Sequence, residues 1–133
     1  MPARRPDPRG PASVAAVVRA LDSGVAPDQV ELRIAVRHLL QLLALRHPGH
    51  SLEVRVPPIA AVQCLEGPRH TRGTPPNVVE TDPVTWIMLA TGRLTWAQAV
   101  RNAAVQASGA RADLAGYLPV FARGVPGGWH PPG

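Results

Sequence analysis

The residue types that most often do chemistry are scarce in this chain. It has one cysteine, Cys64, and five histidines among 133 residues. A single cysteine excludes an internal disulfide framework and a zinc site built from several cysteines. Nucleophilic catalysis would need Cys64 partly exposed beside a base. The residue lies within a predicted strand, between Gln63 and Leu65, so we expect a buried, unreactive thiol.

The histidines and carboxylates show no spacing typical of a metal or catalytic site. His47 and His50 flank Pro48-Gly49 in a predicted turn, and no third ligand is evident near them. Helix caps and a solvent-facing strand explain the carboxylates, and no two are spaced as a general acid and base. The sequence also lacks the phosphate-loop, HExxH and GxSxG motifs. We therefore expect no catalytic residue, no metal and no cofactor.

One polar loop is a candidate anion site. Arg69, His70 and Arg72 lie close together in the stretch 67–77, which consists largely of turn residues. Guanidinium groups bind carboxylates and phosphates with paired hydrogen bonds. The loop could hold an anionic head group or, in a small enzyme, an anionic substrate. The alternative is an exposed polar connection without a ligand.

The largest candidate set is apolar. Its members lie on two predicted short helices joined by Gly92-Arg93-Leu94, and on one face of the strand that follows. Such a set often forms only core, but it can also line a concave, mostly apolar binding site between a helix layer and a sheet. The candidate ligand-binding residues are Trp86, Ile87, Leu89, Leu94, Trp96, Val100 and Val105.

Composition narrows the class of protein. Hydrophobic residues make up 45% of the chain and charged residues 17%, which is a globular profile. The net charge is +5, but all basic residues are arginines dispersed along the chain, and few aromatic residues are available to stack on bases. We expect no nucleic-acid partner. No apolar run is long enough to span a membrane and no signal peptide is evident, so we expect a cytoplasmic protein.

The first half of the chain predicts two helices and two strands. Residues 1–11 are rich in proline and are expected to form a disordered tail. Val14, Val17, Val18 and Leu21 form an apolar stripe on a helix that starts at residue 12 or 13 and stops near Asp22. A second, largely buried helix spans 27–47. Alternating residues 52–56 and the stretch 59–65 indicate strands, with the intervening prolines favouring a bend or an edge position.

The second half predicts a third and fourth strand separated by two short helices. The strands are residues 78–81 and 103–108. Asp82 and Thr95 are expected to cap helices at 83–91 and 96–102, and Gly92 to end the first of them. A last helix is expected at 110–118, and 122–133 has the composition of a disordered tail. This order predicts an α+β fold of one domain, residues 12–121, with helices on one face of a small antiparallel or mixed sheet.

The segment 80–121 resembles the C-terminal half of the sterol carrier protein fold. The resemblance rests on a strand leading to a capped helix, the turn Thr91-Gly92-Arg93-Leu94, Ala99 in a short helix, a strand at 105–109 and a final helix at 114–118. The stretch 54–82 is similar to the actinobacterial branch of sterol carrier family proteins. Together these pieces make the motif order fairly specific, although each piece alone is a weak signal.

The resemblance implies a non-enzymatic lipid-binding module with an apolar tunnel between sheet and helices. Its ligand would be a fatty acyl chain, a sterol-like molecule or an isoprenoid. Two alternatives remain open: an accessory or scaffold domain that acts through a partner enzyme without a lipid, and a small enzyme that uses the loop carrying Arg69, His70 and Arg72. We expect an apolar small molecule as the main partner and no integral membrane association.

Overall fold

A computed structural model describes residues 6–67 and 77–121 of the chain. The predicted tails at 1–5 and 122–133 lie outside the described residues. So does the candidate anion loop with Arg69, His70 and Arg72. The α+β class predicted for the chain is confirmed: within the described residues, four α-helices accompany a four-stranded mixed sheet.

Helix α1 spans Gly10–Asp22 and starts before the predicted residue. The prediction that proline keeps the first eleven residues out of a helix was wrong for Gly10 and Pro11. Proline is tolerated in the first turn, where its missing N–H has no intrahelical partner in any case. The apolar stripe is confirmed, because Val14, Val17 and Val18 are buried.

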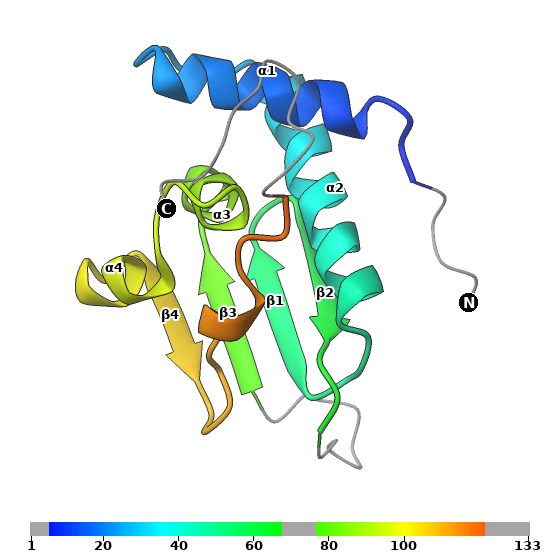
Figure 1. Ribbon diagram of the computed structural model, residues 1–133, viewed down its shortest axis with the longest axis vertical. Helices are drawn as coiled ribbons and strands as arrows, with labels where there is room; N and C mark the ends of the chain where they lie inside the picture. Colours follow the sequence, from blue (N-terminus) through cyan, green and yellow to red (C-terminus); the bar gives the residue numbers. More distant parts are fainter. Residues whose placement is uncertain (1–5, 68–76, 122–133) are drawn as a thin grey trace.

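Helix α2, Gln29–Arg46, supplies much of the core. The Asp28 carboxylate caps it by accepting a hydrogen bond from the Glu31 backbone N–H at 3.0 Å, so the helix begins two residues after the predicted Pro27. Its inward face packs α1 on one side and the sheet on the other (Figure 1). The buried residues of the helix are Leu32, Ile34, Ala35, Val36, Leu39, Leu40 and Leu43.

The sheet has the strand order β2-β1-β3-β4. Strands β1 (Leu52–Val56) and β2 (Ala60–Cys64) are antiparallel neighbours, and β2 is an edge strand, as its flanking prolines predicted. Strand β3 (Asn77–Thr81) pairs with β1 in parallel, and β4 (Val105–Ser108) pairs with β3 antiparallel. The chain therefore crosses from the β2 side to the opposite side of β1 before β3 begins.

One face of this sheet is covered and the other is open. In β1, Leu52, Val54 and Val56 are fully buried, whereas Glu53 and Arg55 between them form an ion pair on the other face. The pairing register places buried residues of neighbouring strands on the same face of the sheet. Val79 of β3, for example, lies beside Val54 of β1 on the covered face. Helices and the C-terminal segment lie on that covered face, which confirms the predicted layer arrangement.

Helices α3 (Pro83–Ala90) and α4 (Trp96–Arg101) follow β3 and begin at their predicted caps. Asp82 accepts a hydrogen bond from the Thr85 backbone N–H at 2.9 Å. Thr95 and Gln98 form a reciprocal capping box. Gly92 adopts a left-handed φ of 79° after α3, as the sequence predicted.

The last predicted helix is wrong. Residues 110–118 contain only one turn of 3₁₀ helix, Ala115–Tyr117. Asp113 diverts the chain by accepting a hydrogen bond from the Ala115 N–H at 2.8 Å, and Gly116 and Pro119 both disfavour helix. The segment instead crosses the covered face of the sheet (Figure 1) and inserts Leu114 and Val120 into the core. Within the described residues, no helix is long and apolar enough to cross a bilayer.

Candidate functional site

The predicted apolar site divides into a buried inner set and an accessible rim. The inner set is Trp86, Ile87 and Leu89 on α3, which are 0%, 0% and 1% exposed. The rim is Leu94, Trp96, Val100 and Val105, which lie on the turn before α4, on α4 and on β4. Leu94, Trp96 and Val105 are half-buried, and Val100 is 53% exposed.

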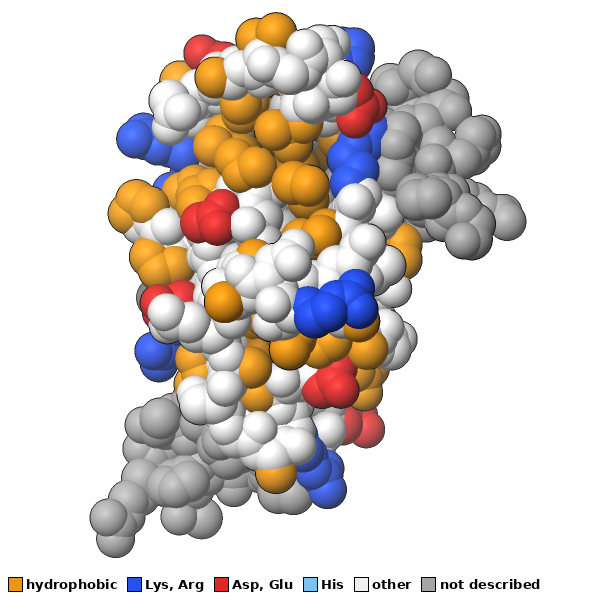
Figure 2. All heavy atoms as spheres, turned by 90° about the vertical axis from the view of Figure 1, so that its left-hand side faces the viewer, with side chains coloured by type: hydrophobic (Ala, Val, Ile, Leu, Met, Phe, Trp, Pro, Cys, Tyr) orange, Lys and Arg blue, Asp and Glu red, His pale blue; other side chains and the backbone are white. Residues whose placement is uncertain are grey.

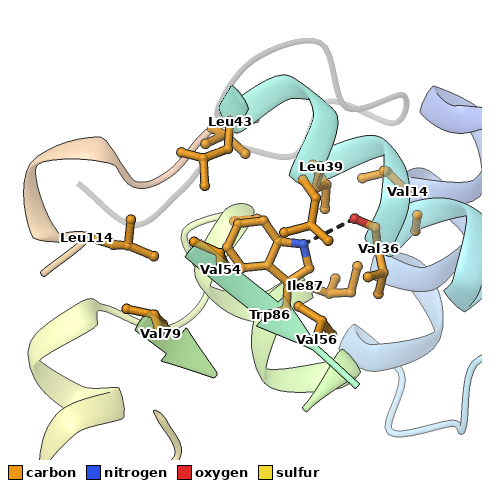
Figure 3. Packing of buried hydrophobic residues seen from close by; sticks show 14 of the residues in the cluster. Val14, Val36, Leu39, Leu43, Val54, Val56, Val79, Trp86, Ile87 and Leu114 are labelled. Carbon is orange, nitrogen blue, oxygen red and sulfur yellow. Dashed lines mark hydrogen bonds between the residues drawn. The ribbon is translucent and has the colours of Figure 1, made fainter. Parts of the chain in front are cut away.

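Trp86 lies at the centre of the core. Its indole N–H donates a hydrogen bond to the Val36 carbonyl oxygen at 3.3 Å, which satisfies the one polar group of the ring. Figure 3 shows the ring enclosed by Leu39 and Leu43 of α2 and by Val54 of β1. Trp86 therefore packs directly between α2 and the sheet, and an incoming ligand can take its place only if this side chain moves.

The rim lies on the side of the molecule formed by α4 and β4. Seen from that side, apolar side chains gather below α1 and are accessible from solvent (Figure 2). Trp96 is half-buried and packs against the core cluster, so it connects the inner set with the surface. Basic side chains flank this apolar area and an acidic side chain lies at its lower edge (Figure 2).

The turn between the two helices is held rigidly. The Thr91 hydroxyl donates to the Ile87 carbonyl oxygen at 2.7 Å. The Arg93 guanidinium donates to both Asp22 oxygens, at 2.8 and 2.6 Å, and so ties the turn to the end of α1. These hydrogen bonds lower the pKa of the Asp22 carboxyl below its ordinary value. The rim thus has a fixed connection to α1, which the sequence pattern did not reveal.

Described residues line clefts elsewhere on the molecule, including two that contain no residue of the predicted apolar site. One, about 300 Å³, lies where β3 meets α3, and Glu80 and Asp82 contribute to its wall. Asp82 is already engaged as the α3 cap. The other, about 490 Å³, lies between the segment before α1 and the outer face of α2. Sequence reasoning missed this second cleft, because the proline-rich segment was expected to be a tail.

Cys64 has the buried environment that its sequence context predicted. The side chain is fully inaccessible, and burial raises the pKa of the thiol to about 11. A thiol of this kind is protonated at neutral pH and is a poor nucleophile. The structure therefore offers no support for cysteine catalysis.

The histidines and carboxylates make structural contacts. The His47 ring contacts the Tyr117 ring edge-to-face at 4.8 Å, and His50 Nδ1 lies 2.6 Å from Gln63 Oε1. Among the described residues, no three His, Cys, Asp or Glu side chains are grouped closely enough to hold a metal ion.

Comparison with known proteins identifies the family. A family model described as bacterial SCP ortholog, where SCP denotes sterol carrier protein, matches residues 13–120. The comparison with curated proteins finds no match. The matched segment contains β1–β4, α2–α4 and most of α1, and this agreement confirms the resemblance inferred from the turn at Thr91-Gly92-Arg93-Leu94 and the elements around it. The chain belongs to the family of bacterial sterol carrier protein orthologs.

Proposed function

We propose that this protein is a non-enzymatic lipid carrier that binds one apolar chain within residues 12–121. The observation that carries the proposal is the family match over residues 13–120. The accessible apolar rim beside a deeply buried aromatic residue supports it, because lipid sites need a surface at which an acyl chain can leave water. A fatty acyl, sterol-like or isoprenoid chain would satisfy the same apolar requirement.

In this proposal the lipid chain first contacts the rim. Val100 and Trp96 lie four positions apart on α4 and so share a helix face. Each methylene removed from water contributes about 0.8 kcal/mol, so eight methylenes contribute roughly 6 kcal/mol before the entropic cost of binding. Burial of an acyl chain therefore supplies affinity without any catalytic group.

Deeper insertion of the chain requires movement of the inner set. Trp86 and Ile87 have no solvent-accessible surface, and the Trp86 indole is anchored to the Val36 carbonyl oxygen. We propose that the chain displaces these side chains from the α4 side as it enters. The intrinsic fluorescence of Trp86 and Trp96 should then change on binding, since their contacts change with occupancy.

A matched pair of substitutions tests the proposal. Val100 on the rim and Val30 on α2 are 53% and 57% exposed, so replacing either by Asp leaves the core intact. In a titration with a fluorescent fatty acid, Val100→Asp should weaken binding by about tenfold or more, because a charge would have to be desolvated beside the acyl chain. Val30→Asp should bind as the wild type does.

The alternative, an accessory domain without a lipid ligand, gives a different result. The folded wild-type protein would then take up no fatty acid, and it would instead co-purify with a partner protein. Equal binding by folded Val100→Asp and wild type would also contradict the rim as the binding site. Far-UV circular dichroism of each variant establishes that it is folded.

A further inference from the structure

The cleft beside α2 combines apolar walls with basic side chains. It measures about 490 Å³ and lies between the segment preceding α1 and the outer face of α2. Figure 1 shows this segment turning down from α1 alongside α2. The lining residues outside the segment recur at helical spacing on α2, so one helix face forms that wall. They are Ile34, Arg37, His38 and Gln41.

The net charge of the residues that line the cleft is positive, because the ion pair between Asp7 and Arg9 cancels and Arg37 remains. Asp7 accepts hydrogen bonds from the Arg9 backbone N–H at 2.8 Å and from the Arg9 guanidinium at 3.1 and 2.9 Å. These two charges therefore compensate each other. Arg37 also lines the cleft, and within residues 6–67 and 77–121 it makes no ion pair. Its guanidinium is the uncompensated charge of the cleft.

His38 is held in place at the wall. A Cβ atom on Gly10 would lie 2.3 Å from His38 Nδ1, so only glycine allows the ring to approach the start of α1 so closely. The Phe121 ring packs edge-to-face against it at 6.0 Å. Burial lowers the pKa of His38, while Asp7 opposes that change. The ring is thus fixed in position, and its burial favours the neutral imidazole over the imidazolium.

We propose that this cleft binds an oxyanion, a phosphate or a carboxylate, through Arg37 and His38. The guanidinium of Arg37 would donate paired hydrogen bonds to the oxygens, and protonated His38 would donate a further one. Pro6, Pro8 and Ile34 give the cleft apolar walls, and Arg37 is exposed, so its guanidinium can reach an anion that enters from solvent. The site is separate from the apolar rim on α4 and does not depend on the lipid proposal.

Nuclear magnetic resonance of the His38 imidazole tests this site directly. The wild-type protein is titrated separately with inorganic phosphate and with hexanoate. We expect saturable shifts of the His38 signals and a higher pKa for His38 in the bound state, since the anion favours the imidazolium. Asp7, Arg9 and Arg37 are the charged groups lining the same cleft, and the free-state titration records their combined influence.

Two arginine variants distinguish specific binding in the cleft from non-specific attraction of anions to a positively charged protein. Arg37→Gln should weaken binding by about tenfold, whereas Arg101→Gln, on exposed α4, should leave it unchanged. Saturation by phosphate alone, hexanoate alone or both supports the site and identifies the preferred oxyanion. Absence of saturation with both probes, or equal binding by Arg37→Gln and wild type, would overturn it.

Discussion

At the scale of single residues, close packing explains why a particular residue type is required at a position, as Gly49 illustrates. Gly49 has a φ of 150°, and a Cβ atom there would lie 1.9 Å from the Leu65 carbonyl oxygen. Only glycine fits that approach of two backbone segments. The sequence predicted a turn at Pro48-Gly49, but it could not predict which segment lies against the turn.

The Asp22–Arg93 ion pair makes a pH-dependent contribution to stability. Its hydrogen bonds lower the pKa of Asp22 below the ordinary value of 3.8. The contribution is therefore present above that ordinary value and is lost as the pH falls through the lower folded-state pKa. Because the Asp22 side chain is 50% exposed, we expect Asp22→Asn to lower the free energy of unfolding by less than about 1 kcal/mol at neutral pH.

Urea unfolding at two pH values measures this contribution. The stability difference between wild type and Asp22→Asn should be larger at about pH 6 than at about pH 3. Asp28→Asn serves as the control, since the Asp28 carboxylate caps α2 without an arginine partner among the described ion pairs. A difference for Asp22→Asn that is the same at both pH values would contradict the assignment.

At the scale of elements, the predicted helices are confirmed where nearby residues specify their ends. The caps Asp82 and Thr95 were predicted because an N-cap is specified by residues within one turn. The helix predicted at 110–118 does not form, because the apolar residues of this segment make tertiary contacts in an irregular conformation. The Val120 and Phe121 N–H groups both donate to the Ala90 carbonyl oxygen, and this distant partner cannot be identified from the spacing of 110–118.

The C-terminal segment should therefore contribute to the core although it is not a helix. Leu114 is 0% exposed and belongs to the main hydrophobic cluster. Leu114→Ala should lower the free energy of unfolding by about 2–5 kcal/mol, because it leaves a cavity in that cluster. Leu45→Ala is the matched control, since Leu45 is 68% exposed and its truncation should change stability only slightly.

Denaturant unfolding followed by circular dichroism compares the two leucine variants. Similar, small losses of stability for Leu114→Ala and Leu45→Ala would show that the segment does not pack on the sheet in solution. A large loss confined to Leu114→Ala supports the packing described above.

At the scale of the whole molecule, the sequence indicated the layers but left the strand pairing open. Alternation in β1 predicted one covered and one solvent-facing side, and this is confirmed by the burial of Val54 between the half-buried Glu53 and Arg55. The parallel pairing of β1 with β3 was not specified, because it depends on the path of the chain between β2 and β3. The candidate apolar residues were chosen by type, and which of them are buried and which are accessible depends on tertiary packing that the sequence pattern does not specify.

The central proposal is that the folded chain carries one lipid molecule. Native mass spectrometry of the wild-type protein equilibrated with palmitate measures this most directly. We predict a complex whose added mass equals one palmitate and which is lost when the protein is unfolded. A spectrum that contains only the unliganded, folded protein in the presence of excess palmitate would contradict the proposal.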